Sequence, residues 1–588
     1  MNRILWALFV VIFFLLLAPN YGLVSSYVDG MISFFDSPVA FIWDCFDLLE
    51  LADPLPFVLL AEAFLLALLG TPARWLLANS IFIALLPFEL FYVWVYGSPS
   101  SSHIISIISE TNFDEIQGYI GSGFGWLLSY FLWLVLVCSV GFGCARLNLK
   151  WRHRSRLWVA VASLCMLLVN FYGHVLTDKG QNAIADLYTE FDPYQFPMDI
   201  GDYRKTYPFG LAIRVFDYFQ QLGVLEGHAR MLRAASDVHS RNADFGREAP
   251  EENYVVVIGE SSRADHWGLA GYERDTTPRL GVLNNMIFFP NAVSVTAATR
   301  TAVPIILSKT TANDISVGNF KTSWISDFKR AGFEVYWLSM QMPVGVHDTA
   351  IGIYASLANR VQYLNFGSYL NRGGVDDALL PELSKVLADG NKKRLIVLHT
   401  LGSHSPYQRR YPPKFEIFKP VPGQDSVPNL FDATQKELIV NSYDNSILYT
   451  DFILSAIAEK LRQQAGTSLM WYASDHGQSL FDPGCSMAGH GFFSKYNFHI
   501  PVLFWYSDDY AKRHNDELQA IRKNSRERVY MGDFYLTFLQ SAGFKLSGAE
   551  RKNSFSNAGY ISRERLVTID GGRVINYDKD LANASCKL

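Results

Sequence analysis

Leu469-Met470-Trp471-Tyr472-Ala473-Ser474-Asp475-His476-Gly477 is the segment from which the fold class of this chain is best predicted. Its first five residues are apolar, which is typical of a buried strand, and the strand ends directly in a carboxylate and an imidazole. Open α/β sheets keep their sites at the carboxyl ends of strands, and both side chains bind metals. The segment predicts half of a metal site, although a capped turn is an equal alternative for an isolated Asp-His pair.

Four further short apolar runs predict the other strands of this sheet. They are separated by dozens of residues with helical periodicity, and they span residues 254–258, 333–338, 394–398 and 501–505. Short apolar strands that alternate with helices indicate an α/β domain with a largely parallel central sheet and helices on both faces.

Polar residues with metal-binding side chains follow two more of these strands. Glu260 follows the run 254–258, and His399 follows the run 394–398. Because parallel strands end on one side of a sheet, we expect both side chains to converge with Asp475 and His476. Carboxylates and imidazoles without thiolates favour a catalytic Zn²⁺ site, with Mn²⁺ as the second choice.

Several hydroxyl groups lie in residues 294–304, close to an expected helix start. A hydroxyl next to a metal ion can attack phosphorus, and a helix N-terminus favours the charge of a phosphate. The residues alone do not choose among these hydroxyls, and threonines before a helix are most often simple N-caps.

The first third of the chain contains five long apolar stretches, most of them near the ~20 residues that a membrane-spanning helix needs. They cover residues 4–17, 55–69, 75–96, 124–144 and 157–176, and we predict five spans with the first retained. Basic residues fill the second and fourth connections, whereas the first and third are acidic. The positive-inside rule then predicts a cytoplasmic N-terminus and an exterior position for everything from about residue 177 onward.

The predicted domains follow from this layout. Residues 1–177 form a transmembrane domain of about five helices, 178–250 an amphipathic linker near the membrane surface, and 251–588 an exterior domain that contains the predicted metal site. Glu62 and Glu89 lie inside apolar stretches, where a carboxylate is costly, so we expect them to face other helices or an interface. Cys485 and Cys586 are the only exterior cysteines, and their pairing stays open.

The net charge of -5 and the lack of a concentrated basic patch in the exterior part argue against nucleic-acid binding.

A series of motifs runs in order through the exterior part, from about residue 253 to residue 506. They are Gly259-Glu260-Ser261-Ser262-Arg263, His266, Gly271-Tyr272, Arg274-Asp275-Thr276-Thr277-Pro278, Thr299 ahead of Pro304, His399-Thr400-Leu401-Gly402-Ser403-His404, Asn441-Ser442-Tyr443-Asp444-Asn445-Ser446 and Ser474-Asp475-His476-Gly477. This series resembles the phosphoethanolamine transferases of Gram-negative inner membranes, in the sulfatase-like branch of the alkaline phosphatase superfamily.

The resemblance implies a role for each matching residue. Zinc would be bound by Glu260, Thr299, Asp475 and His476, with Thr299 also the nucleophile. His404 and His490 would lie beside the donor phosphate as catalytic groups and would help to hold the phosphoryl group or a second zinc. Substrate-binding residues would be His399 and the acidic third connection, with Glu110, Thr111, Asn112 and Glu115 facing the ethanolamine end of the lipid.

The implied activity is transfer of phosphoethanolamine from phosphatidylethanolamine to lipopolysaccharide, on a core sugar or lipid A, or to another periplasmic glycan. Val295 and Ile305 stand where the lipid A-modifying members carry a cysteine pair, which favours core sugars or other glycans as acceptor. We expect a monomeric, multi-pass inner-membrane enzyme with its catalytic domain in the periplasm. The alternatives are a phosphoglycerol transferase of the lipoteichoic acid synthase type and a non-catalytic membrane metal- or ligand-binding sensor.

Overall fold

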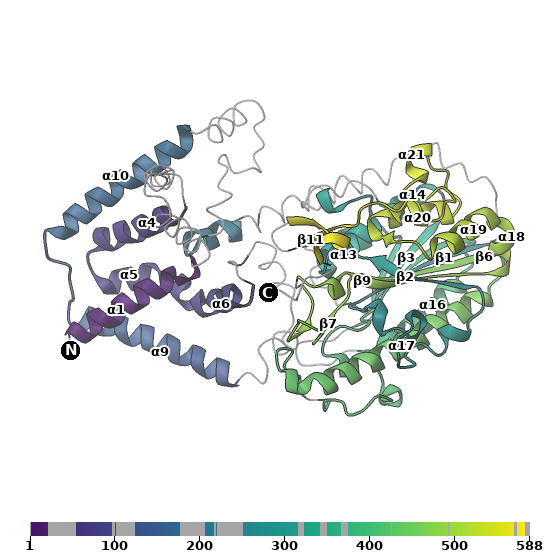
Figure 1. Cartoon of the computed structure of the whole chain (residues 1–588), viewed down its shortest axis with the longest axis horizontal. Helices are drawn as coiled ribbons and strands as arrows, with labels where there is room; N and C mark the ends of the chain where they lie inside the picture. Colours follow the sequence, from purple (N-terminus) through teal and green to yellow (C-terminus); the bar gives the residue numbers. More distant parts are fainter. Residues whose placement is uncertain are drawn as a thin grey trace. The chain divides into compact units, whose positions relative to one another are not determined.

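The computed structural model describes residues 2–20, 54–96, 100, 124–176, 206–216, 219, 251–314, 323–341, 350–365, 374–424, 426–491, 493–569 and 573–581 (Figure 1). The chain divides into two compact units, with the apolar helices in the first and the α/β domain in the second. Each unit is described by itself.

The second unit is built on an eight-stranded mixed sheet with the strand order β10-β2-β9-β6-β1-β5-β3-β4. Strand β9 runs antiparallel to β2 and β6, and the other neighbouring pairs are parallel. The strands are β1 (Glu252–Gly259), β2 (Met286–Val293), β3 (Glu334–Ser339), β4 (Arg360–Tyr363), β5 (Lys393–His399), β6 (Thr467–Ser474), β9 (His499–Tyr506) and β10 (Val529–Tyr530). The predicted α/β fold is confirmed, and the sheet is mixed.

The direction of β9 has a simple cause. Between the end of β6 and the start of β9 the chain forms only the short strands β7 (Ser479–Leu480) and β8 (Ala488–Gly489) and one 3₁₀ turn in the residues that the structure describes. A parallel return usually needs a crossover helix, so the chain comes back antiparallel.

Helices cover both faces of this sheet (Figure 1). Along β1, Tyr254, Val256 and Ile258 face one hydrophobic core, whereas Val255 and Val257 face the other. The first core is closed by α13 (Thr299–Leu307), α14 (Trp324–Arg330), α15 (Ala350–Ala355), α18 (Asp508–Arg513), α19 (Asn515–Asn524) and α20 (Phe534–Ser541), and the second by α16 (Leu379–Leu387) and α17 (Lys436–Arg462). Because β1 is buried on both sides, its end is a rigid place for a functional side chain.

All five predicted apolar stretches are helical in the first unit. The helices are α1 (Asn2–Leu17), α4 (Pro54–Leu69), α5 (Pro72–Ala78), α6 (Ser80–Tyr96), α9 (Phe124–Arg146) and α10 (Ser155–Leu176). The predicted stretch 75–96 is divided between two helices, because the chain bends by 66° between α5 and α6. Asn79 caps the end of α5 at this bend.

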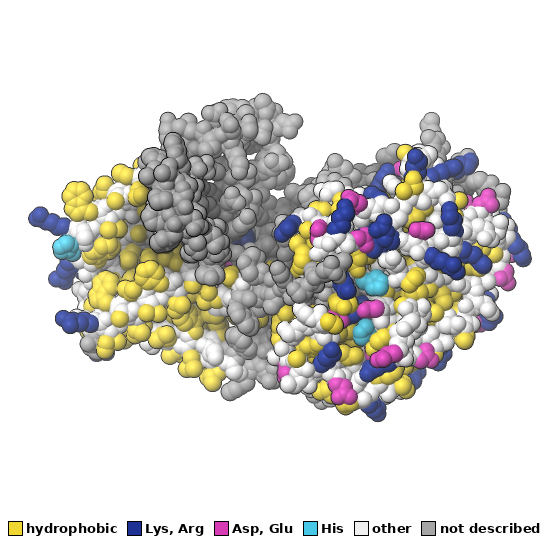
Figure 2. Space-filling model, viewed as in Figure 1, with side chains coloured by type: hydrophobic (Ala, Val, Ile, Leu, Met, Phe, Trp, Pro, Cys, Tyr) yellow, Lys and Arg dark blue, Asp and Glu magenta, His cyan; other side chains and the backbone are white. Residues whose placement is uncertain are grey.

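Among the described residues, two helices are long and apolar enough to cross a membrane, Asn2–Asn20 and Leu128–Arg146. A third is added if the bent pair counts as one span. The count of five spans therefore stays a prediction. Hydrophobic side chains cover the visible face of this unit, and Lys and Arg gather at one end of it (Figure 2).

The two carboxylates within the apolar stretches are buried inside the first unit. Glu62 Oε2 accepts hydrogen bonds from Trp75 Nε1 at 2.8 Å and Asn79 Nδ2 at 3.0 Å, which ties α4 to the α5–α6 bend. Glu89 lies 2.8 Å from the guanidinium of Arg214 and accepts further hydrogen bonds from Ser100. Each carboxylate thus has partners that offset part of the cost of burial.

Arg214 belongs to the described part of the predicted linker 178–250. Residues 209–216 are helical, and Tyr207 and Leu211 are buried in the core of the first unit. The Tyr207 hydroxyl donates to the Phe82 carbonyl, and Asn20 Nδ2 donates to the Tyr207 carbonyl at 2.8 Å. This part of the linker packs as an integral piece of the helical unit.

Cysteines behave differently in the two units. Cys138, Cys144 and Cys165 are free, whereas Cys485 is disulfide-bonded. Cys586, whose pairing with Cys485 was left open, lies outside the described residues.

Candidate metal centre

Three buried residues form a cluster that can hold a metal ion at the carboxyl edge of the sheet. Glu260, Asp475 and His476 each offer a ligand atom, and these atoms lie within 4.8 Å of one another. The register of the sheet explains the convergence, because Gly259 pairs with Ser474 across the parallel strands β1 and β6. The next residue of each strand therefore emerges beside the other.

Thr299 brings a hydroxyl group to this cluster. It is the first residue of α13, and its Oγ1 lies 3.1 Å from Glu260 Oε2 and 3.2 Å from His476 Nε2. Residue 298 is an alanine, so the helix start has no side-chain cap of its own. Thr299 therefore approaches the cluster with its own hydroxyl while the neighbouring segments fix the start of the helix.

The imidazole of His476 presents a free electron pair to the cluster. Its Nδ1 lies 2.8 Å from the Gly477 carbonyl and donates to it, so Nε2 is the unprotonated nitrogen. Burial lowers the pKa of His476 to about 4, which keeps the ring neutral. Nε2 lies 3.4 Å from Asp475 Oδ2 and 3.5 Å from Glu260 Oε1.

The negative charges of Glu260 and Asp475 are only partly compensated by the residues that the structure describes. Burial, followed by the charge of Asp475, raises the pKa of Glu260 well above its usual range. Asp475 Oδ1 accepts hydrogen bonds from the backbone N–H groups of Ser261 and His476, but Oδ2 has no hydrogen-bond partner among the described residues. Buried carboxylate oxygens beside an unprotonated imidazole nitrogen fit a divalent cation, and this donor set suits zinc.

Two further histidines lie at the rim of the cluster. The ring of His490 stacks on that of His476 with 4.2 Å between centroids, and His404 lies 6.4 Å from His490. The Nδ1 atoms of His490 and His404 bind the carbonyls of Ala297 and Ser405 at 3.1 and 2.7 Å. Burial lowers the pKa of both rings to about 3, so each ring is neutral with its proton on Nδ1.

His399 was expected to converge with Asp475 and His476, but the structure places it elsewhere. It is 2% exposed and ends β5, next to β1, but it is not part of the metal cluster. Its Nε2 has no hydrogen-bond partner among the described residues, and its ring packs edge-on against Trp337 at 5.8 Å. Residues Glu110, Thr111, Asn112 and Glu115 lie outside the described residues, so their predicted role in binding the lipid head group stays a prediction.

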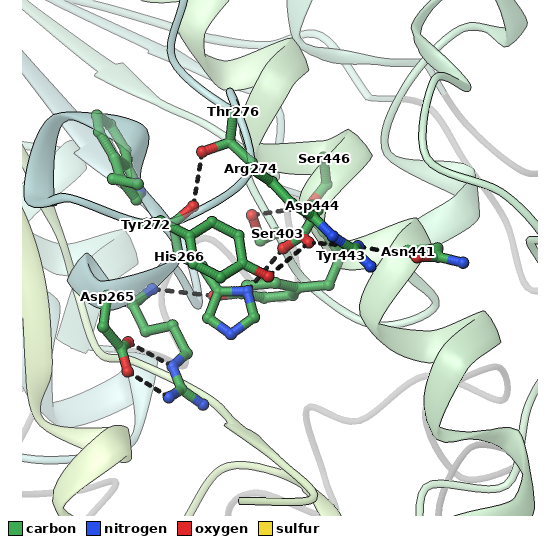
Figure 3. A network of polar contacts seen from close by, with 12 residues as sticks. Asp265, His266, Tyr272, Arg274, Thr276, Ser403, Asn441, Tyr443, Asp444 and Ser446 are labelled. Atoms are coloured by element: carbon green, nitrogen blue, oxygen red, sulfur yellow. Dashed lines mark hydrogen bonds and ion pairs between the residues drawn. The ribbon is translucent and has the colours of Figure 1, made fainter.

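A polar network that has no role in the predicted site supports the loop after β1 (Figure 3). His266 Nδ1, Tyr272 OH and Arg274 Nη1 all point at the buried carboxylate of Asp444, at 2.6, 2.9 and 2.8 Å. The three donor residues belong to motifs that can be read from the sequence. Their common acceptor Asp444 lies on α17, so these contacts depend on how that helix packs and cannot be read from the sequence.

The hydroxyl of Tyr443 joins this network to the metal cluster. It accepts from Arg263 N at 2.9 Å and donates to Ser261 O at 2.8 Å. Ser261 N in turn donates to Asp475 at 3.0 Å. Helix α17 thus holds the residues that follow the predicted ligand Glu260.

A comparison with protein families assigns this unit. The Sulfatase family profile matches residues 252–544. This part of the chain is a sulfatase-family domain. The sulfatase-like resemblance predicted from the motifs is thereby confirmed.

Several curated relatives of the chain are named phosphoethanolamine transferases. EptA of Escherichia coli strain K12 is 29% identical over 335 residues, which cover 55% of this chain and 58% of that protein. EptC of the same strain is 24% identical over 493 residues and covers 81% of each chain. The chain thus matches little more than half the length of EptA but most of EptC.

Solved structures with the same fold include both a whole protein and an isolated domain. The integral membrane protein lipooligosaccharide phosphoethanolamine transferase A of Neisseria meningitidis superposes with a TM-score of 0.55 at 20% identity, covering 84% of this chain and 87% of that one. The C-terminal periplasmic domain of EptC from Escherichia coli, solved as a zinc complex, superposes at 0.52 and 23% identity, covering 58% and 96%. At this identity the likeness concerns the fold.

Proposed function

We propose that this chain is an inner-membrane phosphoethanolamine transferase in which Thr299 is the nucleophile. The observation that carries the proposal is the position of Thr299 Oγ1, 3.1 Å from Glu260 Oε2 and 3.2 Å from His476 Nε2. A hydroxyl in this position can be activated for attack on phosphorus. The names of the relatives support phosphoethanolamine as the group transferred.

In the proposed site, Glu260, Asp475, His476 and Thr299 would hold a zinc ion. When bound, the ion lowers the pKa of the threonine hydroxyl and offsets the charge that develops on the phosphoryl oxygens. The unpartnered Asp475 Oδ2 and the unprotonated His476 Nε2 support this ligand set. Mn²⁺ is the less suitable alternative for a site with an imidazole ligand.

The first half of the proposed reaction forms a covalent intermediate. Thr299 Oγ1 attacks the phosphorus of phosphatidylethanolamine, and the bond from phosphorus to the diacylglycerol oxygen breaks. The threonine proton passes to Nε2 of His404 or His490 and from there to the departing diacylglycerol oxygen. The unprotonated Nε2 atoms of these rings suit this task, which needs a reach of about 3 Å.

The second half returns the threonine. A hydroxyl of the acceptor attacks the phosphorus, its proton moves to the same imidazole, and the bond from phosphorus to Thr299 Oγ1 breaks as Oγ1 regains a proton. The acceptor that we propose is lipopolysaccharide or another periplasmic glycan. Val295 and Ile305, buried at 1% exposure in the main core, occupy the positions of the cysteine pair in lipid A-modifying members and support a glycan over lipid A.

The proposed cellular arrangement follows from the helical unit and the charges at its end. The N-terminal helices anchor the chain in the inner membrane, the basic end of the helical unit lies in the cytoplasm, and the catalytic domain lies in the periplasm as part of a monomer. Residues 1–177, 178–250 and 251–588 remain the proposed boundaries of the membrane domain, linker and catalytic domain.

Intact mass spectrometry of the purified full-length chain tests the reaction. After incubation with phosphatidylethanolamine, we expect a phosphoethanolamine adduct that is absent in Thr299→Ala. A phosphoglycerol adduct formed from phosphatidylglycerol would instead support the phosphoglycerol transferase. Zinc binding without any adduct or lipid turnover would support the sensor and overturn the proposal.

A second experiment identifies the acceptor. Lipopolysaccharide and periplasmic glucans from cells with and without the gene are compared by mass spectrometry. Phosphoethanolamine on one of these classes in the presence of the gene supports the proposed acceptor, and its absence from all of them overturns this part of the proposal.

A further inference from the structure

A small hairpin near the C-terminus lies outside the region that matches the sulfatase family. It consists of β11 (Leu566–Ile569) and β12 (Arg573–Asn576), which pair antiparallel beyond the matched residues 252–544. Figure 1 shows β11 beside α13, the helix that begins with Thr299. The hairpin therefore adds a contact to the site that the matched family region does not include.

The hairpin holds the segment that leads into Thr299 by its backbone. Thr568 N donates to the Val295 carbonyl at 2.8 Å, and Thr568 forms a parallel β-bridge with Thr296. Within the hairpin, Thr568 faces Val574. The N–H of Thr568 donates to Val295, so this N–H group lies on the edge of β11 that faces away from β12 and is not used in the pairing of the two strands.

Apolar side chains seal the same contact. Val567 and Ile575 of the hairpin, at 0% and 6% exposure, pack in one cluster with Ala297 and Phe498. Ala297 lies two residues before Thr299, so this cluster fixes the backbone directly before the nucleophile.

A buried arginine locks the base of the hairpin to the central sheet. Arg565 donates to the backbone carbonyl of Asn291 at 3.0 Å and to its side chain at 2.8 Å. Its guanidinium also pairs with Asp578 beyond β12. Since Asn291 belongs to β2, the hairpin is anchored to the sheet that carries the metal ligands.

The clamped segment controls two groups of the proposed site at once. Ala297 supplies the carbonyl that binds His490 Nδ1 at 3.1 Å, and Ala298 is the N-cap of α13 without a capping side chain. On its other side the segment is held by Ser294 N, which donates to Phe498 O at 2.8 Å. A shift of this segment would therefore move Thr299 and turn His490 together.

We propose that the β11–β12 hairpin is a positioning element of the catalytic site. It holds residues 295–298 so that Thr299 Oγ1 and His490 face the metal ligands in one fixed geometry, with the Thr568 N–H as its central contact. The inference rests on the proposed function, because it concerns the attack by Thr299.

Two substitutions at residue 568 test the backbone contact in the full-length enzyme. Thr568→Pro removes the N–H that binds Val295, on the side of β11 away from the β12 ladder, whereas Thr568→Val retains it. We expect T568P to lower the kcat of diacylglycerol release by about 10- to 100-fold, as for a small misplacement of reacting groups. Its KM for phosphatidylethanolamine and its zinc content should stay near those of the wild type, and T568V should retain most of the kcat.

An unchanged kcat in folded T568P, or equal losses in T568P and T568V, would overturn the inference. If T568P does not fold, Ile575→Ala opens a cavity beneath Ala297 and carries the same expectation. Ile521→Ala, a cavity in the main core, is its control, and an equal loss of kcat in both would overturn the inference as well. Absence of turnover and adduct in the wild type would instead refute the proposed function.

Discussion

Asp475 Oδ2 lies 3.4 Å from His476 Nε2 and has no hydrogen-bond partner among the residues that the structure describes. An unpartnered carboxylate oxygen that is fully buried costs several kcal/mol unless a cation or donor meets it. The adjacent imidazole cannot be that donor, because its proton lies on Nδ1 and is bound by the Gly477 carbonyl. Both atoms are therefore suited to bind a cation.

Asp475→Asn should therefore abolish stoichiometric zinc binding. The amide removes one negative charge from the cluster and places a donor group where a ligand is needed. Substitutions that only support a ligand weaken metal binding by about 10- to 100-fold, so the loss of a ligand should exceed this range. Zinc per chain, measured by elemental mass spectrometry after dialysis, checks the expectation. Asp508→Asn on the surface is the control, and full zinc occupancy in D475N would count against the ligand set.

His490 offers a way to separate proton transfer from metal binding. In His490→Asn the amide N–H₂ can still donate to the Ala297 carbonyl, but the basic Nε2 is gone. We expect kcat to fall by about 10²- to 10⁴-fold, the usual contribution of a general base, while zinc content stays unchanged. Rates of diacylglycerol release from phosphatidylethanolamine check this. A wild-type rate in H490N would leave His404 as the base.

Thr299→Ser distinguishes the loss of the nucleophile from the loss of helix geometry. Serine keeps the hydroxyl at the start of α13 and lacks only the methyl group. We expect T299S to form the phosphoethanolamine adduct and to bind zinc, with a lower rate because the hydroxyl rotor is less restricted. Intact mass after incubation with the lipid is the measurement. If T299S forms no adduct although it retains zinc, the hydroxyl at this position is not the attacking group.

The convergence of two ligands was predictable because each of them comes just after a strand. Glu260 and Asp475 are the first residues after β1 and β6, and parallel pairing makes the ends of these strands neighbours. The same rule also predicted that His399 converges with these ligands, because His399 ends the neighbouring strand β5, but His399 is not part of the metal cluster. Strand position fixes the edge at which a residue lies, whereas the direction of its side chain depends on packing against Trp337.

Other features depend on contacts between residues far apart in the sequence. The bend at Asn79 lies inside a continuous apolar stretch, and Glu62, which binds there, is 17 residues away. The hairpin that holds Val295 comes from residues more than 270 positions later, in a segment with no motif. Periodicity carries no information about such partners.

We predict that loss of the buried ion pair Glu89–Arg214 strongly lowers the stability of the helical unit. Their side chains are only 6% and 3% exposed, so Glu89→Gln would leave the arginine buried with less compensating charge. Breaking such a pair costs about 3–5 kcal/mol, whereas replacing both partners with apolar groups is often close to neutral. We expect a lower Tm in detergent for E89Q and substantial recovery in the double variant E89L/R214M. Equal Tm values for E89Q and the wild type would contradict this.

Asp376 predicts a pH dependence in the catalytic domain. Its carboxylate accepts hydrogen bonds from the N–H groups of Leu401 and Gly402 at 2.7 and 3.0 Å, in the loop that carries His404. Burial nevertheless raises the pKa of Asp376 from 3.8 to about 6. The folded state therefore binds this proton more tightly than the unfolded chain does.

The sign follows from this raised pKa. The contribution of Asp376 to stability is fully present below about pH 4 and is lost as the pH rises through about 6. The free energy of unfolding of the wild type, relative to Asp376→Asn, should thus decrease by on the order of 3 kcal/mol between pH 4 and pH 7. Denaturant unfolding followed by tryptophan fluorescence measures the difference, with Asp377→Asn as the charge control. A difference that is constant over this range would show that the carboxyl group does not titrate between pH 4 and pH 7.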